Sequence, residues 1–229
     1  MHSTLAHALA RASLPIVLAD HRVVRVRRLG RTAYARMLAR MREFSAARDE
    51  STPDEIWLTE HPPVYTLGLA AKREHLLDAG GIEVQECDRG GQVTYHGPGQ
   101  AIAYVLIDLH RRGIRVREMV NLIEQALIDT LANFGIAGER RAAMPGVYVG
   151  AAKIAALGLK VRNGRCYHGA SLNVDLDLAP FAGINPCGYP GLASTSLKEQ
   201  GSKAGVRDAG ERVATHLTSL LEHYSVARP

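Results

Sequence analysis

The sequence predicts an α+β fold in which helices flank a mixed or antiparallel β-sheet. Segments with the composition of strands come in clusters that contain hairpin signals, and the helical segments stand apart from these clusters. No Gly-x-Gly-x-x-Gly motif joins a strand to a helix, although a doubly wound dinucleotide-binding fold would carry one. The length of 229 residues is compatible with one large domain or two small ones, and residues 1–21 form an extension with little structural signal.

The predicted strands are short runs rich in β-branched and aromatic residues, bounded by Gly, Pro or Asn. They lie at 22–29, 54–60, 64–67, 82–87, 93–95, 101–109, 146–149, 151–161 and 165–174. Asn163 and Gly164 separate the last two runs, and this pair favours a two-residue hairpin turn because both residues adopt a positive φ. The two runs are thus expected to pair antiparallel.

Three amphipathic helices are predicted at 31–48, 115–134 and 206–224, where apolar residues recur at intervals of three and four. Thr32 is expected to cap the first helix, and Gly135 to end the second. The apolar stripes expected to face the core are Tyr34, Leu38, Met41 and Phe44 in the first helix, Val116, Val120, Ile123, Leu127, Leu131 and Phe134 in the second, and Val213, Leu217, Leu220 and Tyr224 in the third.

Composition is that of an ordinary globular protein, since 46% of the 229 residues are hydrophobic and 22% are charged. Three cysteines without a Cys-x-x-Cys pair are a poor basis for disulfides or a structural zinc site, and they suit a reducing compartment. The longest apolar run near the start, 14–19, is too short to span a membrane. We therefore expect a cytoplasmic protein without a metal site.

The formal charge of +5 is spread along the chain and forms no basic tract with interleaved aromatic residues. Nucleic-acid binding is therefore the weakest functional interpretation. The charge fits either an ordinary soluble surface or mild steering towards an acidic partner.

The segment 88–100 places Arg89, Tyr95 and His96 among two pairs of glycines. Glycine lets the backbone approach a ligand closely, arginine offers a fork of donors to an anion, and histidine can move a proton. The segment is therefore a candidate binding wall. The alternative is a glycine-rich turn beside a surface arginine.

Lys153 lies among small and apolar residues, and it is one of only five lysines among 28 basic residues. Small neighbours leave room for a ligand, and a buried ammonium group requires a nearby partner. The alternative is that Lys153 points outward from an edge strand while its neighbours face the core.

Cys187 stands between Pro186 and Gly188 in a Pro- and Gly-rich loop at 180–191. Core cysteines lie within regular elements, as Cys166 and Cys87 are expected to do. Cys187 is therefore the candidate nucleophile, and its thiolate would need a positive charge nearby.

Three segments together resemble the defining motifs of the lipoyl(octanoyl) transferases. They are RGGQVTYHGPGQ at 89–100, KIAALGLKVRNGRCYHGASLNVDLDL at 153–178 and FAGINPCGY at 181–189. Their order also matches, as do the 34 positions that separate Lys153 from Cys187. The resemblance covers about residues 22–200 of the chain.

This resemblance implies the biotin and lipoate protein ligase fold, with a mixed β-sheet and flanking helices, and a single catalytic acyltransferase domain at 22–229. It implies transfer of an octanoyl group from octanoyl-acyl carrier protein to a specific lysine of acceptor proteins, without a cofactor. The acceptors would be the lipoyl domains of 2-oxoacid dehydrogenases and the glycine-cleavage H protein. Neither nucleic acid nor a membrane is an expected partner.

The family's catalytic cysteine falls on Cys187 and its partner lysine on Lys153. The implied mechanism is a thiolate that receives the octanoyl group as a thioester and then passes it to the acceptor lysine. His96 and Asn173 are further polar candidates, for which a structural role stays open. The residues that fall on the family's substrate-binding segments are Arg89, Gly90, Gly91, Gln92, Val93, Thr94, Tyr95, His96, Ala156, Leu157, Gly158, Gly169, Ala170 and Ser171.

Two alternatives keep the same fold or the same pocket. An ATP-dependent lipoate or biotin ligase also uses a lysine but needs no nucleophilic cysteine, so Cys187 and the sequence HGPGQ favour the transferase. A catalytically silent acyl-carrier-binding domain would have no reason to keep Lys153 and Cys187 at this spacing.

The charge generates the first testable prediction. If the basic surface steers an acidic partner, kcat/KM for acyl transfer should fall severalfold as the salt concentration rises from about 0.02 M to about 0.5 M, because the screening length then shrinks well below ~10 Å. Initial rates measured across this range check the expectation. A rate that does not change with salt would contradict steering.

Overall fold

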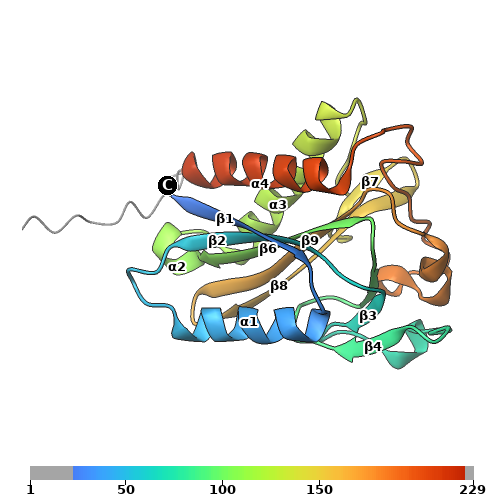
Figure 1. Ribbon diagram of the computed structural model, residues 1–229, viewed down its shortest axis with the longest axis horizontal. Helices are drawn as coiled ribbons and strands as arrows, with labels where there is room; N and C mark the ends of the chain where they lie inside the picture. The colour runs from blue at the N-terminus through green and yellow to red at the C-terminus, as the bar shows by residue number, and fades with distance from the viewer. Residues whose placement is uncertain (1–22, 225–229) are drawn as a thin grey trace, which may run out of the picture.

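A six-stranded mixed sheet forms the centre of the structure, a computed structural model that describes residues 23–224 (Figure 1). Within this sheet, the strands at Val24–Arg31 and Asp54–Glu60 pair in parallel, and the other neighbouring strands pair antiparallel. The strand order is β1 (Val24–Arg31), β2 (Asp54–Glu60), β6 (Gln100–Asp108), β9 (Arg165–Asn173), β8 (Ala152–Arg162) and β7 (Val147–Val149).

Helices cover both faces of this sheet, which gives the layered arrangement in Figure 1. The helices α3 (Val116–Asn133) and α4 (Val206–Glu222) lie on one face, and α1 (Tyr34–Ala47) lies on the other. A short helix, α2 (Leu109–Arg112), follows β6 directly. Within residues 23–224, no helix has the length and apolar content needed to cross a membrane.

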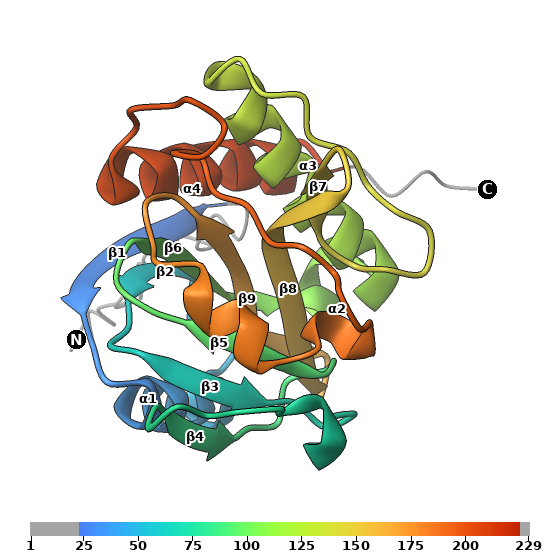
Figure 2. The same cartoon turned by 90° about the vertical axis from the view of Figure 1, so that its right-hand side faces the viewer.

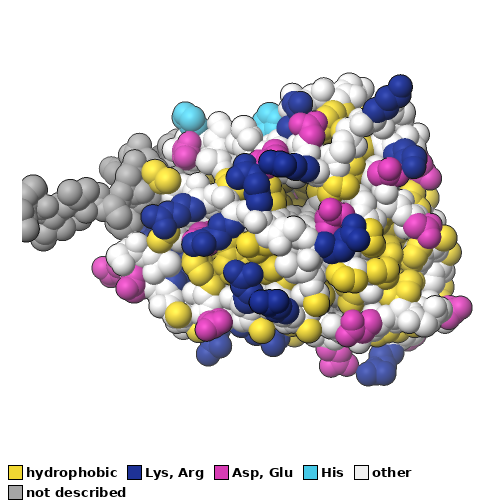
Figure 3. Space-filling model, in the orientation of Figure 1, with side chains coloured by type: hydrophobic (Ala, Val, Ile, Leu, Met, Phe, Trp, Pro, Cys, Tyr) yellow, Lys and Arg dark blue, Asp and Glu magenta, His cyan; other side chains and the backbone are white. Residues whose placement is uncertain are grey.

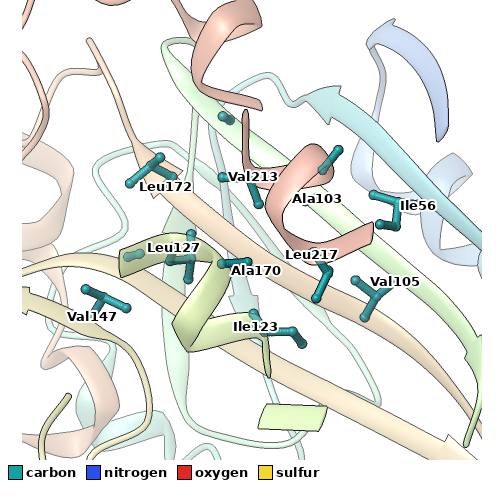
Figure 4. Close-up of a cluster of buried hydrophobic side chains, with 14 of the residues drawn as sticks. Ile56, Ala103, Val105, Ile123, Leu127, Val147, Ala170, Leu172, Val213 and Leu217 are labelled. Atoms are coloured by element: carbon teal, nitrogen blue, oxygen red, sulfur yellow. The ribbon is translucent and has the colours of Figure 1, made fainter. Parts of the chain in front are cut away.

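The main core lies between the sheet and the helices α3 and α4 (Figure 4). Alternate residues of the strands, such as Val105 on β6 and Leu172 on β9, meet Leu127 and Leu217 from the two helices. Burying each such side chain contributes about 1.5–3 kcal/mol. A second apolar cluster on the opposite face joins α1 to Trp57 and other strand residues.

A second, three-stranded sheet lies beside the α1 face of the large sheet. Its order is β4 (Glu83–Glu86), β3 (Val64–Leu67) and β5 (Val93–His96). Figure 2 shows the segment between β9 and α4 passing in front of β5. Three 3₁₀ helices belong to this region: η1 (Arg73–His75), η2 (Ala179–Gly183) and η3 (Pro186–Gly188).

The fold class is confirmed, with a mixed sheet and flanking helices, and the predicted strands and helices are present with small changes at their ends. Asn163 and Gly164 have φ values of 51° and 73° and connect β8 to β9, so the predicted hairpin turn is confirmed. Gly135 ends α3 with a φ of 73°, as predicted. The short helix α2 and the 3₁₀ helices were not predicted, because segments of three to five residues carry no periodicity.

Two details of the predicted helices are wrong. Thr32 does not cap α1: the N-cap is Ala33, and the Thr32 hydroxyl bonds to Thr59 instead, 2.8 Å away. Val116 is exposed because it stands at the start of α3, where Met119 takes the buried position. In α4 the predicted stripe is confirmed, since Leu220 packs partly buried against the core, and Leu221 is also buried there.

The positive charges of the edge strand β1 are largely paired with carboxylates. Arg27 bonds to Glu55 at 2.5 Å, and Arg28 bonds to Glu211 on α4. On the face shown in Figure 3, basic and acidic side chains are interspersed with apolar ones. This surface agrees with the scattered charge of the sequence.

A buried carboxylate connects the start of β2 to two neighbouring elements. Asp54 is fully buried and contacts Arg48 at 2.6 Å, Arg111 at 2.7 Å and Arg112 at 2.5 Å. It also accepts the backbone N–H of Asp108 at 2.8 Å. Because Arg48 follows α1 and the other two arginines belong to α2, one side chain holds three segments together.

Asp54→Ala should lower the free energy of unfolding by about 3–5 kcal/mol, because it leaves buried arginines without their counter-charge. Glu86→Ala is the control: Glu86 pairs with Arg73 in a solvent-exposed salt bridge, so its loss should cost less than about 1 kcal/mol. Urea unfolding curves of both variants test this. A similar decrease in the free energy of unfolding in both variants would contradict a strong stabilising role for the buried ion pairs of Asp54.

Candidate active site

A cavity that is partly open to solvent lies between the α1 face of the large sheet and the small sheet. One wall comes from β6, β8 and β9, and the facing wall comes from β5 and the loop before it. Phe181, Pro186 and Ser194, from the segment between β9 and α4, close one side. The cavity thus forms where three segments far apart in the sequence meet.

Small residues form the floor of the cavity. In the register of the large sheet, Ala156 lies opposite Ser171 and Gly158 opposite Gly169, and all four line the cavity. A Cβ atom at Gly169 would lie 2.0 Å from the carbonyl oxygen of Ala103, so only glycine permits this approach of β6.

Lys153 is buried on β8, with 5% of its surface exposed, and it lines the cavity. Its Nζ donates to the carbonyl oxygen of Pro145 at 2.8 Å and lies 5.3 Å from the centre of the Tyr148 ring. β7 pairs with this part of β8, so the strand is not an edge there. The alternative in which Lys153 points outward from an edge strand is therefore wrong.

The turn before β7 shapes the surroundings of Lys153. Gly146 has a φ of 134°, and a Cβ there would lie 2.4 Å from Cε of Lys153, so glycine makes room for the lysine chain. The backbone N–H of Gly146 donates to Glu124 on α3 at 2.9 Å, and Glu124 pairs with Arg140. The position of the ammonium group is thus set from α3 through this turn.

The backbone of Cys187 lies in η3, which packs against β5. Its neighbour Pro186 lines the same cavity as Lys153, and its neighbour Gly188 lies beside Gln92. The side chain of Cys187 lies outside the described part of the structure. The fold therefore brings the backbone of the candidate nucleophile to the cavity that holds Lys153.

The other two cysteines are core residues, as predicted. Cys87 and Cys166 are 8% and 1% exposed. Burial raises the pKa of the Cys166 thiol to about 12, which keeps it protonated. Neither has the surroundings of a reactive thiol.

Most of the residues in the three predicted binding segments line the cavity. From the first segment these are Arg89, Gly91, Gln92, Val93, Thr94 and His96, and from the other two they are Ala156, Leu157, Gly158, Gly169, Ala170 and Ser171.

Two residues of the first segment do not line the cavity. The Gly90 N–H donates to the carbonyl oxygen of Leu159 at 2.8 Å, which ties the loop to β8. Tyr95 points into the apolar cluster under the small sheet, 5.5 Å from the Tyr65 ring. Successive strand residues face opposite sides, so His96 and Thr94 face the cavity and Tyr95 does not.

The Arg89 guanidinium is bound largely by the protein itself. Its Nη2 donates to the backbone and side-chain oxygens of Thr66 at 2.7 and 2.9 Å, and its Nη1 donates to the carbonyl oxygen of Gly90. The terminal guanidinium nitrogens, which the sequence analysis expected to bind an anion, therefore donate to oxygens of β3 and of the adjacent loop.

His96 and Asn173 belong to one hydrogen-bond chain. His96 Nδ1 lies 2.8 Å from Oε1 of Gln100, whose amide nitrogen donates to Asn173 at 2.9 Å. Asn173 in turn donates to the carbonyl oxygen of Thr195. Burial, reinforced by the nearby His61, lowers the pKa of His96 to about 3, so the ring is neutral at physiological pH.

His168 is the main lining residue that sequence reasoning did not single out. It is 1% exposed, and its Nε2 lies 2.8 Å from Oδ1 of Asp88. Its φ is 66°, which is unusual for a residue other than glycine. His168 and its neighbour Tyr167 consequently both reach Asp88, and their rings stack 5.1 Å apart.

Tyr34, from the start of α1, and Tyr104, from β6, also line the cavity without having been predicted to do so. The sequence marked Tyr34 only as part of an apolar helix face. No local signal could pair His168 with Asp88, which lies 80 positions earlier.

Comparison with known proteins identifies the family. The model of the lipoyl protein ligase A/B catalytic domain matches residues 33–218. The octanoyltransferase of Aromatoleum aromaticum is 59% identical over 205 residues, which are 89% of this chain and 89% of that protein. The chain belongs to the lipoyl(octanoyl) transferases. It is therefore an acyltransferase enzyme that acts in octanoyl transfer for protein lipoylation.

The octanoyltransferase of Dechloromonas aromatica is 57% identical over 197 residues, which are 86% of this chain and 96% of that protein.

Solved structures agree with the family at the level of the fold. Lipoate-protein ligase A bound with ATP has a TM-score of 0.62 at 18% identity, over 87% of this chain and 94% of that one. The bi-partite lipoate protein ligase of Thermoplasma acidophilum has a TM-score of 0.65 at 16% identity, over 87% and 92%. The biotin and lipoate protein ligase fold is thus confirmed.

The buried histidines predict how stability depends on pH. Burial lowers the pKa of His168 to about 4 despite its bond to Asp88, and it also lowers the pKa of His61. Each group binds its proton more readily when unfolded, so stability is present above pH ~6.5 and is lost as the pH falls towards the folded pKa.

Between pH 7.5 and 5.5, His168 should remove about 1.4 kcal/mol from the free energy of unfolding, and His61 should act in the same direction. His168→Asn should lessen this pH dependence by one histidine's share, and Asn tolerates the left-handed backbone at this position. Urea unfolding at several pH values measures both. An unchanged slope in the variant would show that His168 does not titrate on unfolding in this range.

Proposed function

We propose that this enzyme takes octanoyl from octanoyl-acyl carrier protein, holds it as a thioester on Cys187, and transfers it to a lysine of an acceptor protein. The acceptors are the lipoyl domains of 2-oxoacid dehydrogenases and the glycine-cleavage H protein. One observation carries the proposal: the buried Lys153 and the backbone around Cys187 border the same cavity. The family supports octanoyl transfer but leaves the donor, the acceptors and the intermediate as parts of the proposal.

The first half-reaction is attack by the Cys187 thiolate on the thioester carbonyl of the donor. A free thiol has a pKa of about 8.5, so it needs a positive charge nearby to be largely ionised at neutral pH. The Lys153 ammonium group supplies this charge from the cavity wall. A new C–S bond forms, the bond to the carrier's sulfur breaks, and the leaving carrier thiolate takes a proton from the Lys153 ammonium group to depart as a thiol.

The second half-reaction transfers the acyl group to the acceptor. The neutral amine of the acceptor lysine attacks the octanoyl-Cys187 carbonyl, an amide forms, the C–S bond breaks to release the Cys187 thiolate, and the amine's proton passes to Lys153, which restores its ammonium group. Because a thioester is converted to an amide, the reaction runs downhill without ATP or a cofactor.

The cavity walls suit an alkyl chain. Ile102, Val93, Leu157 and Ala170 supply apolar surface, and the small floor residues leave depth for the chain. Binding such a chain removes its apolar surface from water, which contributes about 25 cal/mol for each Å². The three predicted binding segments are therefore proposed to hold the octanoyl group.

We further propose that residues 22–229 act as one catalytic domain in the cytoplasm and that the extension at 1–21 takes no part in catalysis. All the cavity-lining residues fall within 34–194 of the described chain. Residues 1–21 themselves lie outside the described residues.

The decisive measurement is intact-protein mass spectrometry after incubation with octanoyl-acyl carrier protein. The wild type should gain one octanoyl group that hydroxylamine removes, and Cys187→Ser and Cys187→Ala should not form this labile adduct. Transfer to an acceptor domain should fall by at least about 10³-fold in Cys187→Ala, because the nucleophile is lost.

Cys87→Ala serves as the matched control, since Cys87 is buried and its thiol bonds to the Leu67 carbonyl oxygen. It should still form the adduct. Octanoylation of the acceptor without any adduct would contradict the covalent mechanism. Octanoylation that needs free octanoate with ATP and Mg²⁺ would instead establish a ligase.

A further inference from the structure

Arginines gather on one outer face of the molecule, formed by the edge strand β1 and the exposed side of α1. Glu43 is the only acidic residue of either element. Figure 3 shows Lys and Arg side chains gathering on this face, over β1 and between α4 and α1. The exposed arginines of the two elements are Arg25, Arg27, Arg28, Arg31, Arg36, Arg40 and Arg42.

The protein neutralises only part of this charge. Four of the seven arginines pair with a carboxylate of another element. The other three are Arg25, Arg36 and Arg40, and no carboxylate of the described residues forms a salt bridge with them. The face therefore keeps a net positive charge.

The three arginines without a carboxylate partner belong to one continuous surface. Arg36 and Arg40 stand one helical turn apart on α1. The Cζ atom of Arg40 lies 5.3 Å from the centre of the Trp57 ring, and Trp57 stands opposite Arg27 in the sheet. Arg25 is two residues from Arg27, so both side chains point to the same side of the sheet.

The fold gains little from this arrangement of charge. Like charges four residues apart destabilise a helix, and the first turn of α1 contains no acidic residue that would offset them. The neighbouring exposed residues Ala35 and Ala39 are small, so a partner can approach the helix closely. An anionic partner that binds here would complement the charge that the fold leaves over.

The position of this surface relative to Cys187 distinguishes between the two protein substrates. α1 packs against β9, on one wall of the cavity, whereas η3 packs against β5 on the facing wall. The lysine side chain of an acceptor is short, so the acceptor must dock directly over η3. An acyl carrier protein holds its thioester at the end of a long flexible arm, so its body can dock beside the cavity. α1 begins at Tyr34, which lines the cavity, so an arm from this surface has a short way to the site.

We propose that the exposed side of α1 and the neighbouring strand β1 form the docking surface for the carrier protein of the acyl donor, which binds through an acidic patch. Guanidinium groups and carboxylates form strong charge-assisted hydrogen bonds, and complementary charge also speeds the encounter. The identity of the donor comes from the proposed function, on which the assignment of this surface therefore rests.

The surface is tested by comparing a donor that has the carrier with one that lacks it. Initial rates of transfer to a lipoyl domain are measured with octanoyl-acyl carrier protein and with octanoyl pantetheine, a neutral thioester that keeps part of the arm. In the double variant Arg36→Gln/Arg40→Gln, kcat/KM for the carrier donor should fall about tenfold at low salt, mainly through a higher KM. With octanoyl pantetheine it should stay within about twofold of the wild type.

Arg117→Gln is the matched control for Arg36→Gln alone. Both changes remove one exposed arginine from the first turn of a helix, but α3 lies on the opposite face of the large sheet. Arg36→Gln should lower kcat/KM for the carrier donor about threefold, and Arg117→Gln should leave it unchanged. The defect of the double variant should shrink as the salt concentration rises to about 0.5 M.

An unchanged kcat/KM with the carrier donor in the double variant would overturn the docking surface. Equal decreases with the two donors would overturn it as well, because the defect would then lie in the cavity or the fold. A higher KM for the lipoyl domain, with no change for the carrier donor, would assign the face to the acceptor instead and so also contradict the proposal.

Calorimetric titration with the unacylated carrier tests docking without any chemistry. The Kd should rise about tenfold in the double variant, and an equal Kd in both proteins would contradict the surface. The thioester on Cys187 is judged separately, by the octanoyl adduct that either donor leaves on the enzyme. Docking can therefore stand where the adduct is absent, and the adduct can form where docking fails.

Discussion

The shape of the cavity depends on the hydrogen bonds that the Asp88 carboxylate accepts. It stands between β4 and β5 of the small sheet and accepts hydrogen bonds from Tyr167 and His168 on β9 and from Arg42 on α1. The two sheets and α1 therefore converge on one charged group. Because a strand normally points successive side chains to opposite faces, Tyr167 and His168 can both reach Asp88 only with the left-handed φ of His168. The local strain at β9 is offset by these hydrogen bonds.

The opposite end of the cavity is fixed by a separate set of contacts. Glu124 on α3 binds the N–H of Gly146, and the preceding carbonyl of Pro145 accepts from the Lys153 ammonium group. The reacting end is thus anchored to the helical face of the sheet and the tail end to the small sheet. The Lys153 ammonium group can therefore be held in a largely apolar cavity, because the turn that accepts its hydrogen bond is itself bound to the rigid helix α3.

Much of the fold could be predicted because its signals are local. Strand composition and the Asn163-Gly164 pair identify the β8–β9 hairpin, and helical periodicity identifies α1, α3 and α4. The capping of α1 could not be predicted, since Thr32 finds a better partner in Thr59, a residue from another strand. For the cavity, the motif segments pointed to most of the lining, from Lys153 to Arg89 and Gly169. The roles of Tyr34 and His168 depend on contacts across 60 or more positions, and a single sequence does not show these.

The edge strand β1 has a consequence for how copies of the protein meet. A free strand edge offers unpaired N–H and C=O groups to any other strand, and identical edges can pair to begin aggregation. Arg25, Arg27, Arg28 and Arg31 all lie on β1, and pairing of two such edges would bring eight guanidinium groups into one narrow seam. Mutual repulsion then opposes strand addition between copies. In the single molecule, Glu55 on β2 and Glu211 on α4 partly neutralise Arg27 and Arg28. Because both carboxylates belong to neighbouring elements, β1 itself carries only positive side chains.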